Sequence, residues 1–342
     1  MVFDELTLAQ CVEQGVGPFV FPQRLAQGGY SPDECLRMKA VCVQNMQQQV
    51  HLQHILDLAW HALEKAGIEA VLMKGAGLAA LYPEPQQRPW GDIDLFVGKK
   101  QYHAAAKVMR DTFPDARKFD EELDHYKHYN LIAEGVSIEV HRVTIDLPHP
   151  RDKRRYARME EWGTAHAQPL AIGTLNVRVF EPTFNTLFVF LHSWEHMMTS
   201  GAILRQLCDL KLLLQHEKER IDRTKLASDL KALCLTDVWQ LYMWILVERM
   251  GLAQADAPLY TDKVSGRAQR LLTDLLAGKM VMPSAQTQAS SNRFVRKWRT
   301  MKERMKNAER IGIYSPSYAR HMKASIIRSG AKRLFAPDRH WE

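Results

Sequence analysis

The sequence predicts an α+β fold, in which a small mixed β-sheet is flanked by N-terminal and C-terminal helical regions. Apolar residues recur every three or four positions over 31–66, as in a helix, and gather in short strand-like runs between 70 and 180. Helical spacing returns from 182 to 252. We therefore expect an N-terminal helical region (1–69), an α/β core (70–182), a helical domain (183–290) and a basic C-terminal helical tail (291–342).

Local signals define the elements in order. Ser31 and Pro32 begin a long helix that Gly67 ends. Glu134 and Gly135 are typical of a tight hairpin turn between two strands of the core. The core strands are expected at 70–73, 92–97, 126–133, 136–144 and 175–180, with a helix at 99–112 and a later polar linker at 283–291.

The composition and the first residues exclude several classes of protein. The 342 residues are 46% hydrophobic and 25% charged, which is typical of a globular chain with a buried core. No apolar run reaches the roughly 18 residues of a membrane span, and the first segment is acidic where a signal peptide is basic. We therefore expect a cytoplasmic protein. The five cysteines form no CxxC pair, so we expect buried thiols rather than a zinc or redox site.

The basic character of the chain belongs to its C-terminal tail. The formal net charge is +7, but residues 293–342 hold 14 basic and 4 acidic residues, so the rest of the chain is slightly acidic. Such a tail can attract an anionic partner. Aromatic residues lie among the bases, as on many nucleic-acid surfaces: Phe294, Trp298, Tyr314 and Tyr318. Apolar residues at helical spacing in the same tail make a packed helix the alternative.

Asp92 and Asp94 stand two residues apart in a short apolar run. In a strand, residues i and i+2 point to the same face, so both carboxylates aim at one spot while Ile93 and Leu95 face the core. Carboxylates this close repel each other unless a cation lies between them. Their oxygens suit Mg²⁺ or Mn²⁺, and Mg²⁺ lets substrate phosphates complete its coordination. The alternative is that the pair caps the turn after Gly91.

A third carboxylate can join the same site. In the expected strand 136–144, Ile138 and Val140 share one face, whereas Glu139 and His141 share the other. If this strand lies beside the strand of the two aspartates, Glu139 completes a metal site of three carboxylates. Alone, Glu139 would be an ordinary polar residue on a half-exposed strand.

The residues before the aspartates suit phosphate binding. Gly75 and Gly77 follow a strand and open a short helix, where backbone N–H groups bind phosphate and glycines allow close approach. Lys74 and Arg88 add positive charge. The same stretch matches the dinucleotide-binding pattern GxGxxA. Two prolines end the helix too early for that alternative, and the acids open a strand where a ribose-binding acid should close one.

A second motif predicts a different chemistry. His192, Glu195 and His196 match HxxEH, in which two histidines one helical turn apart bind zinc in certain peptidases. A zinc metallopeptidase is therefore an alternative, although the spacing fixes no third ligand. Otherwise the two histidines lie on a partly buried helix and face the α/β core.

The order of these motifs resembles a known family, the bacterial uncharacterised nucleotidyltransferases within the superfamily of the DNA polymerase β type. The pattern consists of Met73-Lys74-Gly75, Tyr82-Pro83, Arg88, Gly91-Asp92-Ile93-Asp94 and Ile138-Glu139-Val140-His141. The resemblance covers about 71–144 well and the helices through Arg205 and Asp209 more loosely. Better-known members have Gly or Ser after the first glycine, whereas here Ala76 follows Gly75 and supplies no hydroxyl for the triphosphate.

The resemblance implies the chemistry and the roles of the residues. It implies Mg²⁺ or Mn²⁺ on Asp92 and Asp94, with Glu139 as the third catalytic and metal-binding acid. Residues assigned to a nucleoside triphosphate are Lys74, Gly75, Gly77 and Arg88, and accessory positions are His141, His192 and His196. The implied reaction moves a nucleoside monophosphate to an acceptor hydroxyl and releases pyrophosphate. The acceptor stays open among a small molecule, a protein and an RNA end, and a non-catalytic nucleotide-binding protein is a further alternative.

Overall fold

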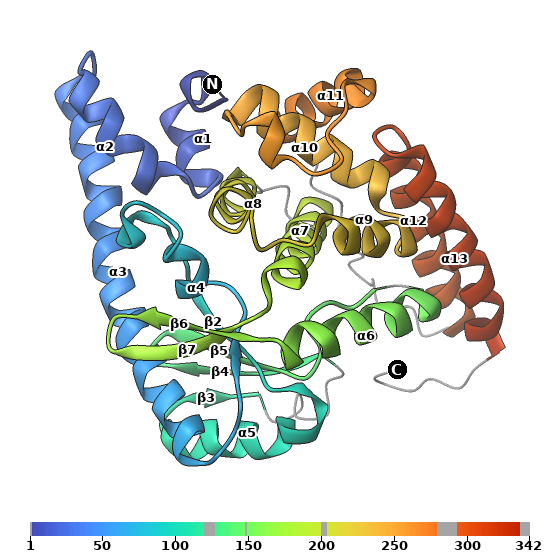
Figure 1. Cartoon of the computed structure of the whole chain (residues 1–342), viewed down its shortest axis with the longest axis horizontal. Helices are drawn as coiled ribbons and strands as arrows, with labels where there is room; N and C mark the ends of the chain where they lie inside the picture. Colours follow the sequence, from blue (N-terminus) through green and yellow to red (C-terminus); the bar gives the residue numbers. More distant parts are fainter. Residues whose placement is uncertain (1, 120–126, 148, 200–203, 279–292, 336–342) are drawn as a thin grey trace.

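The fold is a mixed β-sheet surrounded by helices, which confirms the expected α+β class (Figure 1). The computed structural model describes residues 2–119, 127–147, 149–199, 204–278 and 293–335. The expected linker at 283–291 and Tyr126 of one expected strand lie outside these residues. Among the described helices, none is long and apolar enough to cross a membrane. The residue boundaries of the four expected regions stay predictions.

The main sheet has the strand order β1-β2-β5-β4-β3. The strands are β1 (Val71–Leu72), β2 (Asp92–Phe96), β3 (Arg117–Lys118), β4 (His128–Ala133) and β5 (Val136–His141), and β6 (Gln168–Ile172) and β7 (Leu175–Val179) form a separate hairpin. β2 and β5 are parallel, whereas the other neighbouring pairs are antiparallel. Since β2 and β5 are both interior strands, main-chain hydrogen bonds hold each of them on two sides.

Helices precede, interrupt and follow the sheet, in the order that the sequence predicts. The N-terminal group is η1 (Val2–Glu5), α1 (Leu8–Glu13), α2 (Gly17–Gln27) and α3 (Pro32–Lys65). The helices between strands are α4 (Ala76–Ala79), η2 (Pro85–Gln87), α5 (Gly98–Thr112) and α6 (Pro150–Ala165). The later group is α7 (Pro182–Thr199), α8 (Leu204–His216), α9 (Arg223–Ala232), α10 (Thr236–Met250), η4 (Gln254–Asp256), η5 (Asp262–Val264) and α11 (Ser265–Leu276). The tail forms α12 (Arg293–Gly312) and α13 (Pro316–Phe335).

Capping and turn residues account for several boundaries. The Ser31 hydroxyl accepts from the Glu34 N–H, and the Glu34 carboxylate accepts from the Ser31 N–H at 2.9 Å, which is a capping box at the start of α3. Gly67 follows α3 with a φ of 68°, as a helix-ending glycine does. Glu134 and Gly135 both have positive φ and close the β4–β5 hairpin, as predicted.

Other boundaries differ from those expected. β5 ends at His141 instead of 144, because the Thr144 N–H and hydroxyl bond the buried Glu160 carboxylate of α6 at 2.7 and 2.6 Å. These bonds turn the chain away from the sheet. The helix α6 and the strand β6 are not among the elements that the sequence patterns indicate. The expected strand at 175–180 is present as β7, and β6 pairs with it to form a hairpin that was not expected.

The first hydrophobic core lies between one face of the sheet and the helices α3 and α5. Ile93 and Leu95 of β2, Ile138 and Val140 of β5, and Tyr102 of α5 are buried in it. Burying a large aliphatic side chain stabilises a fold by roughly 1.5–3 kcal/mol. Because alternate residues of a strand face opposite sides, this core places the acidic residues of β2 and β5 on the other face of the sheet.

A second hydrophobic core joins the N-terminal helices to α7, α8, α10 and α11, which gather above the sheet in Figure 1. The tail packs on this core: Tyr314 and Tyr318 are buried, and the Tyr314 hydroxyl donates to Asp274 at 2.8 Å. Burial of these two tyrosines leaves little of their rings for bases to stack on and favours a packed tail, whereas an anionic partner of the tail stays a prediction. The side chains of Phe294 and Trp298 lie outside the described residues.

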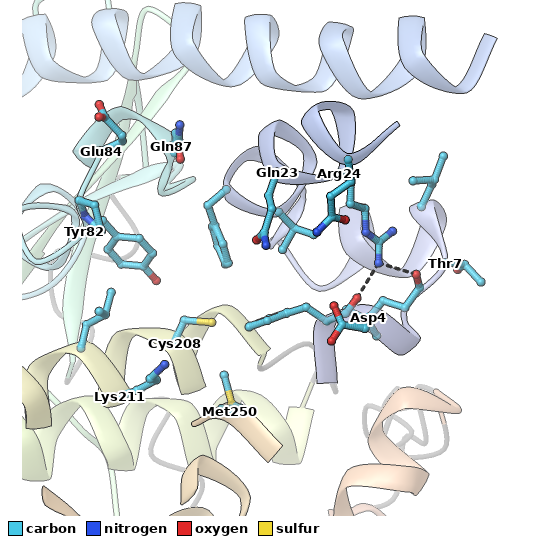
Figure 2. Close-up of a pocket in the computed structure, with 18 of the residues that line it drawn as sticks. Asp4, Thr7, Gln23, Arg24, Tyr82, Glu84, Gln87, Cys208, Lys211 and Met250 are labelled. Carbon is cyan, nitrogen blue, oxygen red and sulfur yellow. Dashed lines mark hydrogen bonds between the residues drawn. The ribbon is translucent and has the colours of Figure 1, made fainter. Parts of the chain in front are cut away.

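The N-terminal helices also border a cavity of about 840 Å³ (Figure 2). One guanidinium nitrogen of Arg24 donates to the carbonyls of Phe3 and Leu6 at 2.6 and 2.8 Å, which ties η1 to α2 beside this cavity. Tyr82 and Cys208 line another part of it. The N-terminal region therefore meets α8 and the turn before η2 around this cavity.

Gly163 allows α6 to approach α7 closely, since a Cβ at this position would lie 2.3 Å from Cγ of Phe184. We expect Gly163→Ala to lower the free energy of unfolding by about 1–3 kcal/mol, because the ring must move. Urea unfolding measures this change. Gly266→Ala in α11 is the matched control: nothing lies within 4 Å of its added Cβ, so it should be neutral or stabilising by up to about 1 kcal/mol. An equal change in the free energy of unfolding of the two variants would contradict the close packing of Gly163 on Phe184.

Candidate active site

The three acidic residues meet on the polar face of the sheet. In the parallel pairing of β2 with β5, Asp94 lies beside Glu139 and Asp92 lies beside Ser137. One carboxylate oxygen from each of the three acids falls within 4.8 Å of the other two. Asp94 is buried, whereas Asp92 and Glu139 are partly exposed. The strand adjacency that a three-carboxylate site requires is therefore present.

Lys74 supplies positive charge between the two aspartates. Its Nζ lies 3.0 Å from Oδ2 of Asp92 and 3.1 Å from Oδ2 of Asp94. Burial disfavours the charged ammonium, but the negative charges of Asp94 and the other two acids outweigh burial and raise the pKa of Lys74. The repulsion between the close carboxylates is thus offset by a cation of the chain itself.

His141 contacts two of the acids from the opposite side. Its Nε2 lies 3.1 Å from Oδ1 of Asp94 and 3.0 Å from Oε2 of Glu139. Burial disfavours the imidazolium, but the hydrogen bonds to both carboxylates outweigh burial and raise the pKa of His141. Burial also raises the pKa of Glu139, yet the hydrogen bond and charge of His141 lower it overall to about 2. Asp94 therefore lies between the Lys74 ammonium and the His141 ring.

The turn after β1 brings Gly75 to the site and leaves Gly77 inside the turn. Gly75 has a φ of 58° and precedes α4, and a Cβ there would lie 3.1 Å from the Trp90 ring. The Gly77 N–H donates to the Lys74 carbonyl at 3.1 Å, so this amide is already used. β1 pairs with β2 in antiparallel fashion, which is incompatible with the parallel unit of a dinucleotide-binding fold. The GxGxxA alternative is therefore wrong.

Arg88 is held in a buried ion pair. Its Nε and one terminal nitrogen each lie 2.7 Å from an oxygen of Asp209 in α8. The Tyr82 hydroxyl donates to the same carboxylate at 2.8 Å, and Arg88 also donates to the Gly75 carbonyl at 3.2 Å. Arg88 thus borders the site while its guanidinium connects the Gly75 turn to α8.

A small hollow of about 60 Å³ lies beside Lys74 and Asp92. Its basic lining residues are Lys74, Arg88, Arg205, His192 and His196. Arg205 donates to the Pro89 carbonyl at 2.8 Å, and burial together with the charge of Arg88 lowers its pKa. Asp92 and Asp209 also line the hollow and pair with Lys74 and Arg88. An anion beside Arg205 would still be stabilised, because burial and the charge of Arg88 disfavour its guanidinium charge.

His192 and His196 contact each other, and the Lys74 ammonium lies against His192. Their Nε2 atoms are 3.1 Å apart, and Nε2 of His192 is 3.2 Å from Nζ of Lys74. Burial and the charge of Lys74 lower the pKa of both histidines. Glu195 instead lies 3.5 Å from Lys127. In the described part of the chain no third metal-ligating side chain joins the two histidines, and the nearby ammonium disfavours a zinc ion there.

The acidic cluster fits a divalent cation. Neighbouring ligands of octahedral Mg²⁺ lie about 3 Å apart, since each is about 2.1 Å from the ion. The position of Nζ of Lys74, 3.0 and 3.1 Å from the two aspartates, shows that a positive group is accommodated between them. Asp92, Asp94 and Glu139 offer carboxylate oxygens, which Mg²⁺ and Mn²⁺ prefer. These three acids are therefore a suitable donor set.

Comparison with known sequences identifies the family. A sequence profile described as uncharacterised nucleotidyltransferase matches residues 4–251. The chain belongs to this family. The match extends well beyond the motif region of the sheet, because it includes the N-terminal helices and continues through α10. The helices α12 and α13 lie after the matched part.

A structural comparison gives a weaker likeness. An antigenic nucleotidyltransferase-like protein from Paracoccidioides brasiliensis is similar over 60% of this chain and 94% of its own chain, at 15% identity and a TM-score of 0.38. A TM-score this low supports no conclusion about the site. A search of curated proteins found no match.

The structure adds two side chains to which the sequence patterns assign no role. His128 of β4 lies opposite His141 in the antiparallel β4–β5 pairing. Alternation within the expected strand 126–133 is a signal that could have placed His128 on the polar face. Arg205 precedes Asp209 by four residues, so one face of α8 carries both, and this spacing could have found it.

Removing Asp209 would leave the Arg88 charge buried without its carboxylate partner, since the two side chains are only 2% and 4% exposed. We expect Asp209→Ala to lower the free energy of unfolding by about 3–5 kcal/mol in urea unfolding. Asp111→Ala is the control because it breaks the surface pair with Lys107, whose side chains are 64% and 78% exposed. In the control, the free energy of unfolding should fall by less than about 1 kcal/mol. Equal losses would show that the buried pair does not hold the Gly75 turn.

Proposed function

We propose that this protein is a metal-dependent nucleotidyltransferase, which moves a nucleoside monophosphate from a nucleoside triphosphate to an acceptor hydroxyl. The observation that carries the proposal is that three carboxylates and a hollow lined by basic groups share one end of the sheet. Carboxylates suit Mg²⁺ or Mn²⁺, and basic groups suit phosphates, so together they suit a metal-bound triphosphate. Membership of the family supports the same class of reaction.

The acids and the basic groups have separate roles in this proposal. Asp92, Asp94 and Glu139 hold the metal, which when bound neutralises charge on the attacking and leaving oxygens of phosphoryl transfer. Glu139 ligates the metal or takes the proton of the acceptor hydroxyl. When the metal takes the position between the aspartates, the Lys74 ammonium would turn with Arg205 toward the phosphates, since both residues line the hollow. The acceptor oxygen bonds to the α-phosphorus, and the bond from this phosphorus to the oxygen that bridges to the β-phosphate breaks. Pyrophosphate leaves, and the hydroxyl proton passes to Glu139 or to solvent.

Other side chains position these groups. His141 holds Asp94 and Glu139 through the two hydrogen bonds of its Nε2. His192 contacts the Lys74 ammonium and keeps it beside the aspartates. Arg88 fixes the carbonyl of Gly75 and thereby the turn where a phosphate would approach the main chain. In this proposal His141 and His192, two of the three predicted accessory residues, orient the groups that act, as does Arg88.

Two rival functions make different predictions. A zinc metallopeptidase would need the HxxEH pair to take up zinc against the neighbouring Lys74 charge, so stoichiometric zinc that is lost on His196→Ala would favour it. A non-catalytic nucleotide-binding protein would bind a triphosphate with metal and release no pyrophosphate. The acceptor stays open among a small molecule, a protein and an RNA end. Labelled ATP, GTP, CTP and UTP incubated with the protein in cell extract would show where the label becomes covalently attached.

Asp92→Asn tests the proposed chemistry. The variant removes one charge from the metal site, so pyrophosphate release in extract should fall by at least about 100-fold, which corresponds to several kcal/mol of lost stabilisation. Mn²⁺ with ATP should raise the melting temperature of the wild type and not that of the variant. Asp111→Asn, on the exposed face of α5, is the matched control and should behave as wild type. Equal pyrophosphate release by Asp92→Asn and wild type would refute the assignment.

Lys74→Met tests the competition between Lys74 and the metal. The variant leaves the buried Asp94 with less positive charge around it, so metal-free stability should fall. Mg²⁺ alone should then raise the melting temperature of the variant by more than that of wild type, because the ion no longer competes with the ammonium. Lys107→Met on α5 is the control. An Mg²⁺ response that is equal in variant and wild type would show that Lys74 does not occupy the metal position.

A further inference from the structure

A second group of metal-ligating side chains lies next to the three acids. His128, Glu139 and His141 each offer one donor atom, and these atoms fall within 4.8 Å of one another. His128 and His141 stand directly opposite across β4 and β5, with ring centroids 4.9 Å apart. Oε2 of Glu139 lies 3.0 Å from Nε2 of His141 and 3.9 Å from Nδ1 of His128. The two histidines therefore flank one carboxylate oxygen.

The donor set of this group differs from that of the three acids. Two imidazole nitrogens and one carboxylate suit Zn²⁺ and related transition-metal ions, whereas Mg²⁺ prefers oxygen alone. Three protein ligands with space for a further one are typical of catalytic zinc. Zinc ligands about 2.0–2.1 Å from the ion lie slightly more than 3 Å apart, so the spacing here needs only small side-chain movements.

The contact between His141 and Glu139 marks a position that an ion could take. Nε2 of the His141 ring is shared between Asp94 and Glu139, at 3.1 and 3.0 Å. On the Glu139 side of this ring nitrogen a metal ion could take the place of the proton, because it would bind both the Glu139 carboxylate and Nε2 of His141.

We propose that His128, Glu139 and His141 form a metal site for a transition-metal ion such as Zn²⁺, beside the oxygen-only position of Asp92 and Asp94. Glu139 is common to both positions. The histidine position lies toward β4, on the side of β5 away from β2 and β1. A role for this second metal in nucleotidyl transfer rests on the proposed function. Metal binding by the two histidines does not depend on the proposed function.

Titration of the metal-depleted full chain with Co²⁺ tests the proposal. Co²⁺ bound by two imidazoles at low coordination number absorbs strongly in the visible, whereas Co²⁺ in an octahedral oxygen site absorbs weakly. We expect the strong absorption in wild type, with displacement by stoichiometric Zn²⁺ and none by Mg²⁺ at equal concentration. His128→Gln should weaken Co²⁺ binding by at least about 10-fold and remove the strong absorption. His103→Gln, an exposed histidine of α5, is the matched control and should behave as wild type.

The outcomes separate this site from the proposed function. Wild-type absorption and affinity in His128→Gln, or equal displacement by Mg²⁺, would overturn the histidine site while leaving nucleotidyl transfer untouched. Asp92→Asn should keep the strong Co²⁺ absorption, since Asp92 is not among its ligands. If pyrophosphate release is absent and His128-dependent Co²⁺ absorption is present, the histidine site stands without the proposed reaction. Circular dichroism checks that His128→Gln is folded, and His141→Gln decides the question if it is not.

Discussion

The buried carboxylate of Asp94 sets the arrangement of the whole site. Burying an ionised carboxylate costs several kcal/mol unless charged or hydrogen-bonding partners surround it. Here the partners come from separate elements, because Lys74 follows β1 and His141 ends β5, while Asp94 itself lies in β2. Three neighbouring strands must therefore be in place before this charge is compensated, and the sheet and the site form together.

A second buried carboxylate, Asp209, joins the sheet region to the helices. It accepts hydrogen bonds from Arg88 and from Tyr82, which lie on either side of η2 and the turn before it. Tyr82 also lines the cavity among the N-terminal helices, whereas Arg88 lines the hollow beside the acids. One carboxylate of α8 thus connects a residue that lines the cavity with a residue that lines the hollow.

The sequence predicted those parts of the site that depend on the alternation within strands. Asp92, Asp94 and Glu139 could be placed on one face because Ile93, Leu95, Ile138 and Val140 need the other, and the α+β class followed from the same spacing. It did not predict that Arg88 pairs with Asp209, because 121 residues separate them and no local pattern links distant ion pairs. Gly77 was assigned to phosphate on a motif, but its N–H closes the turn on Lys74. Helix α6 was missed although it carries Glu160, the acid that ends β5 early.

The two-residue turn at Glu134 and Gly135 has a consequence for how this protein can vary. The turn sets which residue of β4 faces which residue of β5, and therefore that His128 stands opposite His141. Because successive side chains of a strand point to opposite faces, one inserted residue in this exposed turn would shift β4 by one position and send His128 toward the hydrophobic core. Loops usually tolerate insertions and deletions freely. The length of this turn is therefore restricted, although the turn contacts no ligand. Related proteins should vary in the amino acids of this turn more readily than in its length.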